Sequence, residues 1–177
     1  MTVQALRDRR IETLAQLLDA HGREIQAVAY LILRDRALAE DVTIETLLTA
    51  FERGGSVRNE DALRPWLLRV ATNKALSIRR STNRVVDLSY ASDRAERGDI
   101  AGDATDRVLL LGAVADLPIQ MRAAVILRYY ADLPIDGVAA ALGKSPNTIK
   151  AQLQVALERL RHSLAEPMPL STETRHA

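Results

Sequence analysis

The chain has 177 residues, of which 47% are hydrophobic, 27% are charged and 3% are aromatic, with a net charge of +1 and no cysteine. The missing cysteines exclude disulfides and thiolate metal sites within this chain, and we find neither an apolar run of about 18 residues nor a secretory signal. We therefore expect a cytoplasmic protein that does not bind a membrane. Abundant Ala, Leu and Arg, with few β-branched runs, predict an all-α fold.

The near-zero net charge hides an alternation of charge along the chain. Residues 54–84 hold seven Lys/Arg and two Asp/Glu, whereas residues 85–116 hold three Lys/Arg and seven Asp/Glu. This alternation favours one surface that binds a polyanion and another that binds protein.

Helical periodicity dominates the first 80 residues, where we expect four helices that close one core. They cover residues 11–18, 25–33, 37–52 and a stretch that begins near Asn59 or Glu60. His21-Gly22 is expected to break the pattern after the first helix, and Gly54-Gly55 to stop the third. Pro65 fits the first turn of the fourth.

Periodicity is lost over residues 81–104, which are polar, acidic and contain two glycines, so a flexible linker is expected there. Helical spacing returns in residues 105–164, which predicts a second small helical domain after a first domain over residues 1–80. The tail, residues 165–177, is expected to be disordered.

A helix-turn-helix is the strongest local signal. A short helix over residues 134–142 is followed by Gly143 and by a helix with Pro146 at its first position and Ser145 as its N-cap. Ile149, Leu153, Ala156, Leu157, Leu160 and Leu164 share one face of this second helix, so the opposite face points outward and suits the major groove of DNA. An ordinary helical hairpin with a polar face is the alternative, but the Gly turn followed by Ser-Pro favours DNA binding.

A basic helix over residues 61–81 is the second signal. Its positive charges are Arg69, Lys74, Arg79 and Arg80, and Arg84 follows after the end of this range. The simpler explanation for these charges is a helix face that is exposed to water and binds nothing. Trp66 is expected to anchor the core. Asn73 has poor helix propensity in this position, so it is either functional or simply exposed.

Nothing in the sequence indicates catalysis. His21, His162 and His176 are scattered, and no nucleophile motif, carboxylate pair or glycine-rich phosphate loop accompanies them. Asp41 and Glu45 share a helical face, yet a metal site would need more ligands. We expect neither enzymatic activity nor a cofactor or metal.

Two blocks of sequence together resemble the extracytoplasmic-function (ECF) group of bacterial RNA polymerase sigma factors. The first is AEDVTIETL, residues 39–47, followed by PWLLRVATNKA, residues 65–75, and Arg79-Arg80. The second runs from Leu117-Pro118 through LRYY, residues 127–130, to SPNTIK, residues 145–150. The resemblance covers roughly residues 14–164 and implies a promoter-specificity subunit that binds core polymerase and melts promoter DNA.

The resemblance also implies roles for particular residues. The clamp helices of the largest polymerase subunit would be bound by Glu40, Asp41 and Glu45. The minus-ten element would be bound and opened by Arg64, Trp66, Arg69, Asn73, Lys74, Arg79 and Arg80. The minus-thirty-five element would be read by Lys144, Ser145, Pro146, Asn147, Thr148, Lys150, Ala151, Gln152 and Gln154. The second domain would also contact the polymerase flap, and a polymerase-bound monomer and an anti-sigma factor partner fit the family.

Four positions depart from the family pattern. Ile44 replaces a glutamine, Gly137 a glutamate, and Gln152 and Val155 common arginines. These losses motivate an alternative, a sigma-like decoy that binds an anti-sigma factor or polymerase without using promoters. A simple helix-turn-helix repressor is a third hypothesis, but it leaves the basic helix unexplained.

Overall fold

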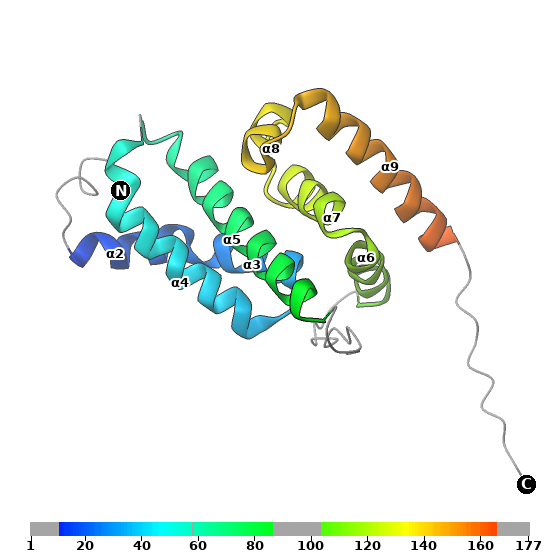
Figure 1. Ribbon diagram of the computed structural model, residues 1–177, viewed down its shortest axis with the longest axis horizontal. Coiled ribbons are helices and arrows are strands. Elements are labelled where there is room, and N and C mark those ends of the chain that lie inside the picture. The colour runs from blue at the N-terminus through cyan, green and yellow to red at the C-terminus, as the bar shows by residue number, and fades with distance from the viewer. Residues whose placement is uncertain (1–10, 58, 87–103, 166–177) are drawn as a thin grey trace, which may run out of the picture.

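A computed structural model describes residues 11–57, 59–86 and 104–165 of the chain (Figure 1). These residues form helices joined by short turns, with no strand among them, which confirms the all-α prediction. The expected tail and most of the expected linker lie outside the described residues.

The first half of the chain forms a group of helices in which α3, α4 and α5 pack against one another and α2 packs on α4. The elements in order are α2 (Ile11–Leu17), the π-helix η1 (Leu18–Gly22), α3 (Arg23–Leu33), α4 (Arg36–Arg53), the 3-10 helix η2 (Gly54–Ser56) and α5 (Leu63–Val86). In Figure 1 this group runs from blue to green.

The break expected at His21-Gly22 is wrong, because the chain stays helical from Ile11 to Leu33. Gly22 is buried and has helical backbone angles, with φ −57° and ψ −45°. A Cβ at this position would lie 2.7 Å from Leu18 Cδ1. The glycine therefore permits close packing within a π-helical turn, instead of ending the helix.

Side-chain caps fix where α4 and α5 begin. The Leu38 N–H donates to Asp35 Oδ1 at 2.9 Å, and the Ala62 N–H donates to Asn59 Oδ1 at 2.9 Å. Because Asn59 holds a turn, the α-helix begins only at Leu63, a few residues later than expected.

Helix α5 also ends later than expected. It continues to Val86, although the sequence predicts a linker from residue 81. Ser81 Oγ donates to Ser77 O at 3.2 Å and Thr82 Oγ1 donates to Ile78 O at 3.0 Å. These bonds accommodate polar residues inside a helix, so their polarity does not end it.

The second half of the chain forms another group of helices, coloured green to red in Figure 1. Its elements are α6 (Ala104–Asp116), α7 (Ile119–Val125), the π-helix η3 (Ile126–Tyr130), α8 (Ile135–Leu142) and α9 (Pro146–Ala165). Helix α9 packs against α6, α7 and α8.

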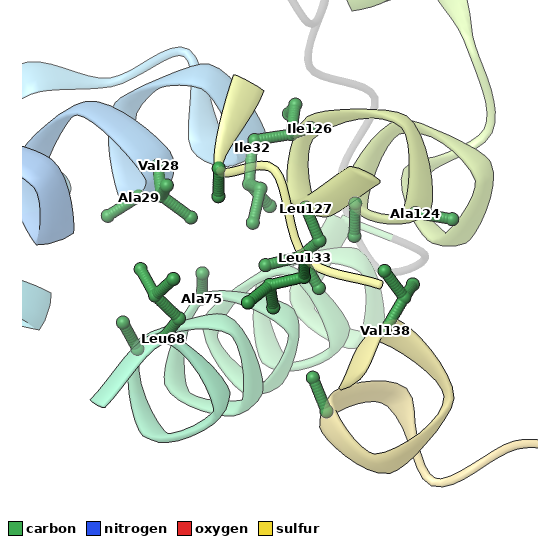
Figure 2. Close-up of a cluster of buried hydrophobic side chains, with 14 of the residues drawn as sticks. Val28, Ala29, Ile32, Leu68, Ala75, Ala124, Ile126, Leu127, Leu133 and Val138 are labelled. Carbon is green, nitrogen blue, oxygen red and sulfur yellow. The ribbon is translucent and has the colours of Figure 1, made fainter. Parts of the chain in front are cut away.

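The two groups share one continuous hydrophobic core. Helix α5 packs against α8, and α3 packs against η3 and α7. Figure 2 shows Leu127 and Leu133 of the second group in the middle of the cluster, close to Ile32 of the first group, with Leu68 on one side and Val138 on the other. The sequence predicted a core for the first domain but not this packing between domains.

Replacing Leu127 by Ala is expected to lower the free energy of unfolding by about 3 kcal/mol, because Leu127 is fully buried in the shared core and truncation leaves a cavity. Urea denaturation followed by circular dichroism measures the change. Leu164→Ala is the matched control and should cost less than about 0.5 kcal/mol, because Leu164 is 47% exposed. Equal losses in both variants would contradict the packing described.

Candidate nucleic-acid and polymerase interfaces

Helices α8 and α9 form the expected helix-turn-helix. Gly143 ends α8 in the left-handed conformation, with φ +64°, which glycine adopts without strain. The backbone N–H of Lys144 donates to Ala139 O at 3.0 Å. This turn directs the chain into α9.

Ser145 caps α9 as predicted. The Thr148 N–H donates to Ser145 Oγ at 3.1 Å, and the two hydroxyl oxygens lie 2.8 Å apart. Buried Ile149, Leu153, Ala156 and Leu160 fix the inward face of the helix. Leu164, expected on the same face, is instead half-exposed at the far end.

The structure brings most of the predicted minus-thirty-five residues together on the outward side of the α9 N-terminus. The exposed ones are Ser145, Pro146, Asn147, Thr148, Lys150, Ala151 and Gln154, with Lys144 half-exposed. Gln152 differs, because it is half-buried and its Oε1 is enclosed with no hydrogen-bond partner among the described residues. Its amide is therefore turned partly toward the protein.

The predicted minus-ten residues differ from one another in their exposure to solvent. Arg69, Asn73 and Arg80 are exposed and, with Ser77, follow one another along a single stripe of α5. Trp66 is half-buried against the hydrophobic core, in agreement with its expected role as an anchor. Arg79 is half-buried. The side chain of Arg84 lies outside the described residues.

Lys74 joins the two predicted surfaces of the first domain. Its Nζ lies 2.9 Å from Glu45 Oε2, so a residue predicted to bind DNA pairs with one predicted to bind polymerase. Glu45 is more exposed than Lys74 in this pair, with side-chain exposures of 62% and 28%.

Arg64 is bound within the protein through its Nε and Nη2 atoms, which the sequence did not predict. Its Nε donates to Glu24 Oε2 at 3.0 Å, and its Nη2 donates both to Glu24 Oε1 and, at 2.6 Å, to the backbone oxygen of Ala131. Arg64 therefore links the first domain to the second.

Burial lowers the pKa of nearby His21, on which the charges of Glu24 and Arg64 act in opposite directions.

One of the predicted polymerase residues, Glu40, lines an apolar groove that the sequence prediction missed. Glu40, Asp41 and Glu45 are exposed on α4. The groove lies between α2, η1 and α4, and its lining includes Leu14, Leu18, Thr43, Ile44, Leu47 and Leu48. Ile44 and Leu48, one helical turn apart beside three acidic residues, were the signal that could have revealed it.

No other chemistry stands out in the part of the chain that the structure describes. No three of its His, Asp and Glu side chains gather where they could hold a metal ion. None of its helices has both the length and the apolar character needed to cross a membrane.

Comparison with known proteins identifies the family. The model for Sigma-70 region 2 matches residues 17–85, and the model for Sigma-70, region 4 matches residues 107–160. ECF RNA polymerase sigma factor SigL of Mycobacterium tuberculosis is 34% identical over 157 residues, covering 85% of this chain and 88% of that protein. RNA polymerase sigma factor CarQ of Myxococcus xanthus is 27% identical over 167 residues, covering 93% and 96%. The chain belongs to the ECF group of RNA polymerase sigma factors.

Solved structures share the fold. Sigma factor RpoE of Bartonella quintana, in complex with the anti-sigma factor NepR, has a TM-score of 0.75 at 24% identity, covering 87% of this chain and 98% of that one. CnrH, in complex with the cytosolic domain of CnrY, has a TM-score of 0.67 at 19% identity, covering 92% and 94%.

Substituting Ser145 by Ala should destabilise the protein by about 1 kcal/mol, because the N–H of Thr148 loses its capping acceptor. Urea denaturation of the full chain measures this loss. Ser163→Ala, an exposed serine in the last turn of the same helix, should leave the unfolding midpoint almost unchanged. Identical midpoints for the parent and S145A would show that this cap contributes nothing.

Proposed function

We propose that this sigma factor brings core RNA polymerase to promoters by reading the minus-thirty-five element with α9 and opening the minus-ten element with α5. The observation that carries the proposal is the capped, exposed N-terminus of α9, held by the Gly143 turn in helix-turn-helix geometry. The chain contributes binding and strand separation, and it catalyses no covalent step.

Reading of the minus-thirty-five element rests on the chemistry of the exposed face of α9. The amides of Asn147 and Gln154 can bond adenine edges, and Lys150 can reach guanine or a phosphate. Ala151 can contact a thymine methyl group. The amide groups at the helix start favour a phosphate oxygen.

Opening of the minus-ten element rests on the exposed stripe of α5. Arg69 and Arg80 supply positive charge for the phosphate backbone, and Asn73 offers an amide to an unpaired base. Binding of flipped bases offsets a few kcal/mol of unstacking. Trp66 is half-buried, so its ring offers only part of its surface for stacking.

The polymerase surface combines the apolar groove with its acidic edge. Leu18, Ile44 and Leu48 are each about half-exposed, and Glu40 lies beside them. Exposed apolar side chains bordered by acidic ones suit an amphipathic helix with a basic flank, such as a clamp helix.

The second domain would contact the polymerase flap. Work with polymerase implies a cytoplasmic location, and the complexes of RpoE with NepR and of CnrH with CnrY support an anti-sigma factor as a further partner.

The shortage of cations in the first turns of α9 implies weak binding of DNA by the second domain alone. Lys150 is exposed at the helix start, whereas Gln152 and Val155 stand where arginines are common in the family. Fewer phosphate contacts release fewer counterions and make binding less salt-sensitive. Within a polymerase complex the second domain is tethered, and a high effective concentration compensates for weak affinity.

A decoy function is the second candidate, motivated by Ile44, Gly137, Gln152 and Val155. One of these changes has a packing reason, since a Cβ at Gly137 would lie 3.3 Å from Pro134 Cδ. Partner binding without reactivity of promoter thymines toward permanganate would favour the decoy. Reactive thymines near minus ten would favour the promoter function.

Run-off transcription from a randomised promoter pool with purified core polymerase tests the proposed function. We expect transcripts well above the core-only level, with selected templates sharing two sequence elements. Core polymerase alone and core with the heat-denatured chain are the controls. Transcription that stays at the core-only level across the pool would refute the proposal.

Asp41→Arg should weaken binding to core polymerase by at least about tenfold, because it reverses an exposed charge on α4 next to Glu40, which lines the groove. Co-elution with core, or titration with a labelled chain, measures this affinity. Glu158→Arg makes the same charge reversal on exposed α9 and should bind core as the parent does. If both variants bind equally, the polymerase surface lies elsewhere.

A further inference from the structure

Two arginines, one in each domain, donate hydrogen bonds to the backbone of the opposite domain. Arg64 of α5 donates through Nη2 to the backbone oxygen of Ala131 in the second domain, at 2.6 Å. Arg122 of α7 donates through Nη1 to the backbone oxygen of Ile32 in the first domain, at 2.8 Å. We call these two hydrogen bonds the arginine clasp.

Each bond of the arginine clasp ends on the C-terminus of a helix in the opposite domain. Ile32 lies in the last turn of α3, and Ala131 is the C-cap residue of η3. Carbonyl groups at these positions lack partners within their own helix and carry partial negative charge. Guanidinium groups satisfy such carbonyls with charge-assisted hydrogen bonds.

Both sides of the clasp are held in position. Glu24 accepts bonds from both Nε and Nη2 of Arg64 and so holds Nη2 where it also donates to Ala131 O. On the other side, Asp132 adopts a left-handed conformation with φ +50°, and Arg128 Nη1 donates to Leu133 O at 3.1 Å. Arg122 is itself buried and also donates to Ala115 O and Leu117 O.

With the arginine clasp formed, the chain cannot bind both promoter elements of one promoter at the same time. The two elements lie about 25 base pairs apart, which is about 85 Å along B-form DNA. In the structure, α5 and α8 are in direct contact, and packed helices lie about 8–10 Å apart. The surfaces proposed for the two elements must therefore separate before both can bind one promoter.

We propose that the arginine clasp holds the free chain in a closed conformation, and that its release is a required step before both promoter elements are bound. Arg64 is the switching residue, because its guanidinium, which the sequence resemblance assigned to minus-ten DNA, is already bound to Glu24 and Ala131. The need for release rests on the proposed function, whereas the closed conformation itself does not.

Förster transfer between two dyes on the free chain tests the clasp without DNA or polymerase. The chain has no native cysteine, so Ala37→Cys on α4 and Ser163→Cys on α9, both exposed, give one labelling site in each domain. The parent should show mainly one high-transfer population. Glu24→Gln and Arg64→Lys should each raise the ratio of low-transfer to high-transfer molecules by about fivefold to tenfold. Arg64→Lys removes the guanidinium that donates to Ala131 O, and Glu24→Gln weakens the ion pair that positions this guanidinium.

Arg23→Lys is the matched control, since Arg23 lies next to Glu24 but is exposed to solvent, and it should leave the ratio unchanged. Circular dichroism checks that every variant keeps its helix content. A parent chain found mainly at low transfer, or Glu24 and Arg64 variants that match the Arg23 control, would overturn the proposal. Transcription that fails while the transfer results hold would refute the proposed function but leave the closed conformation intact.

Discussion

Burial of α5 from two directions is the constraint on which the rest of the molecule depends. Its apolar residues pack against α3 and α4 on the side of the first domain and against α8 on the side of the second. A helix covered this way can present charge only along the narrow stripe that remains. That stripe holds Arg69, Asn73 and Arg80, so packing decides which of the basic residues face solvent.

Local chemistry made much of the fold and part of the candidate site predictable. Helical periodicity located the buried faces of α3 and α9 because each buries one stripe against a neighbour. The Gly143 turn and the Ser145 cap were readable because they depend on only a few adjacent residues. The exposed set at the start of α9 followed from these two facts together.

Features that depend on distant parts of the chain were not predictable in the same way. Gly22 looked like a helix break because its reason, close contact with Leu18, is a matter of packing. Arg64 looked free for DNA because its partner Ala131 is 67 residues away. Apolar spacing likewise shows that Leu133 or Ile32 is buried, but not that they lie beside each other across two domains.

The ion pair between Lys74 and Glu45 places a thermodynamic limit on how the two surfaces of the first domain influence each other. If polymerase takes Glu45 and DNA takes Lys74, both draw on one salt bridge, and the resulting coupling free energy must be the same in either order of binding. A partly exposed pair of this kind is worth about 1 kcal/mol or less. Cooperation between the two ligands through this contact is therefore limited to a few-fold, and anything larger has to come from the movement of whole domains.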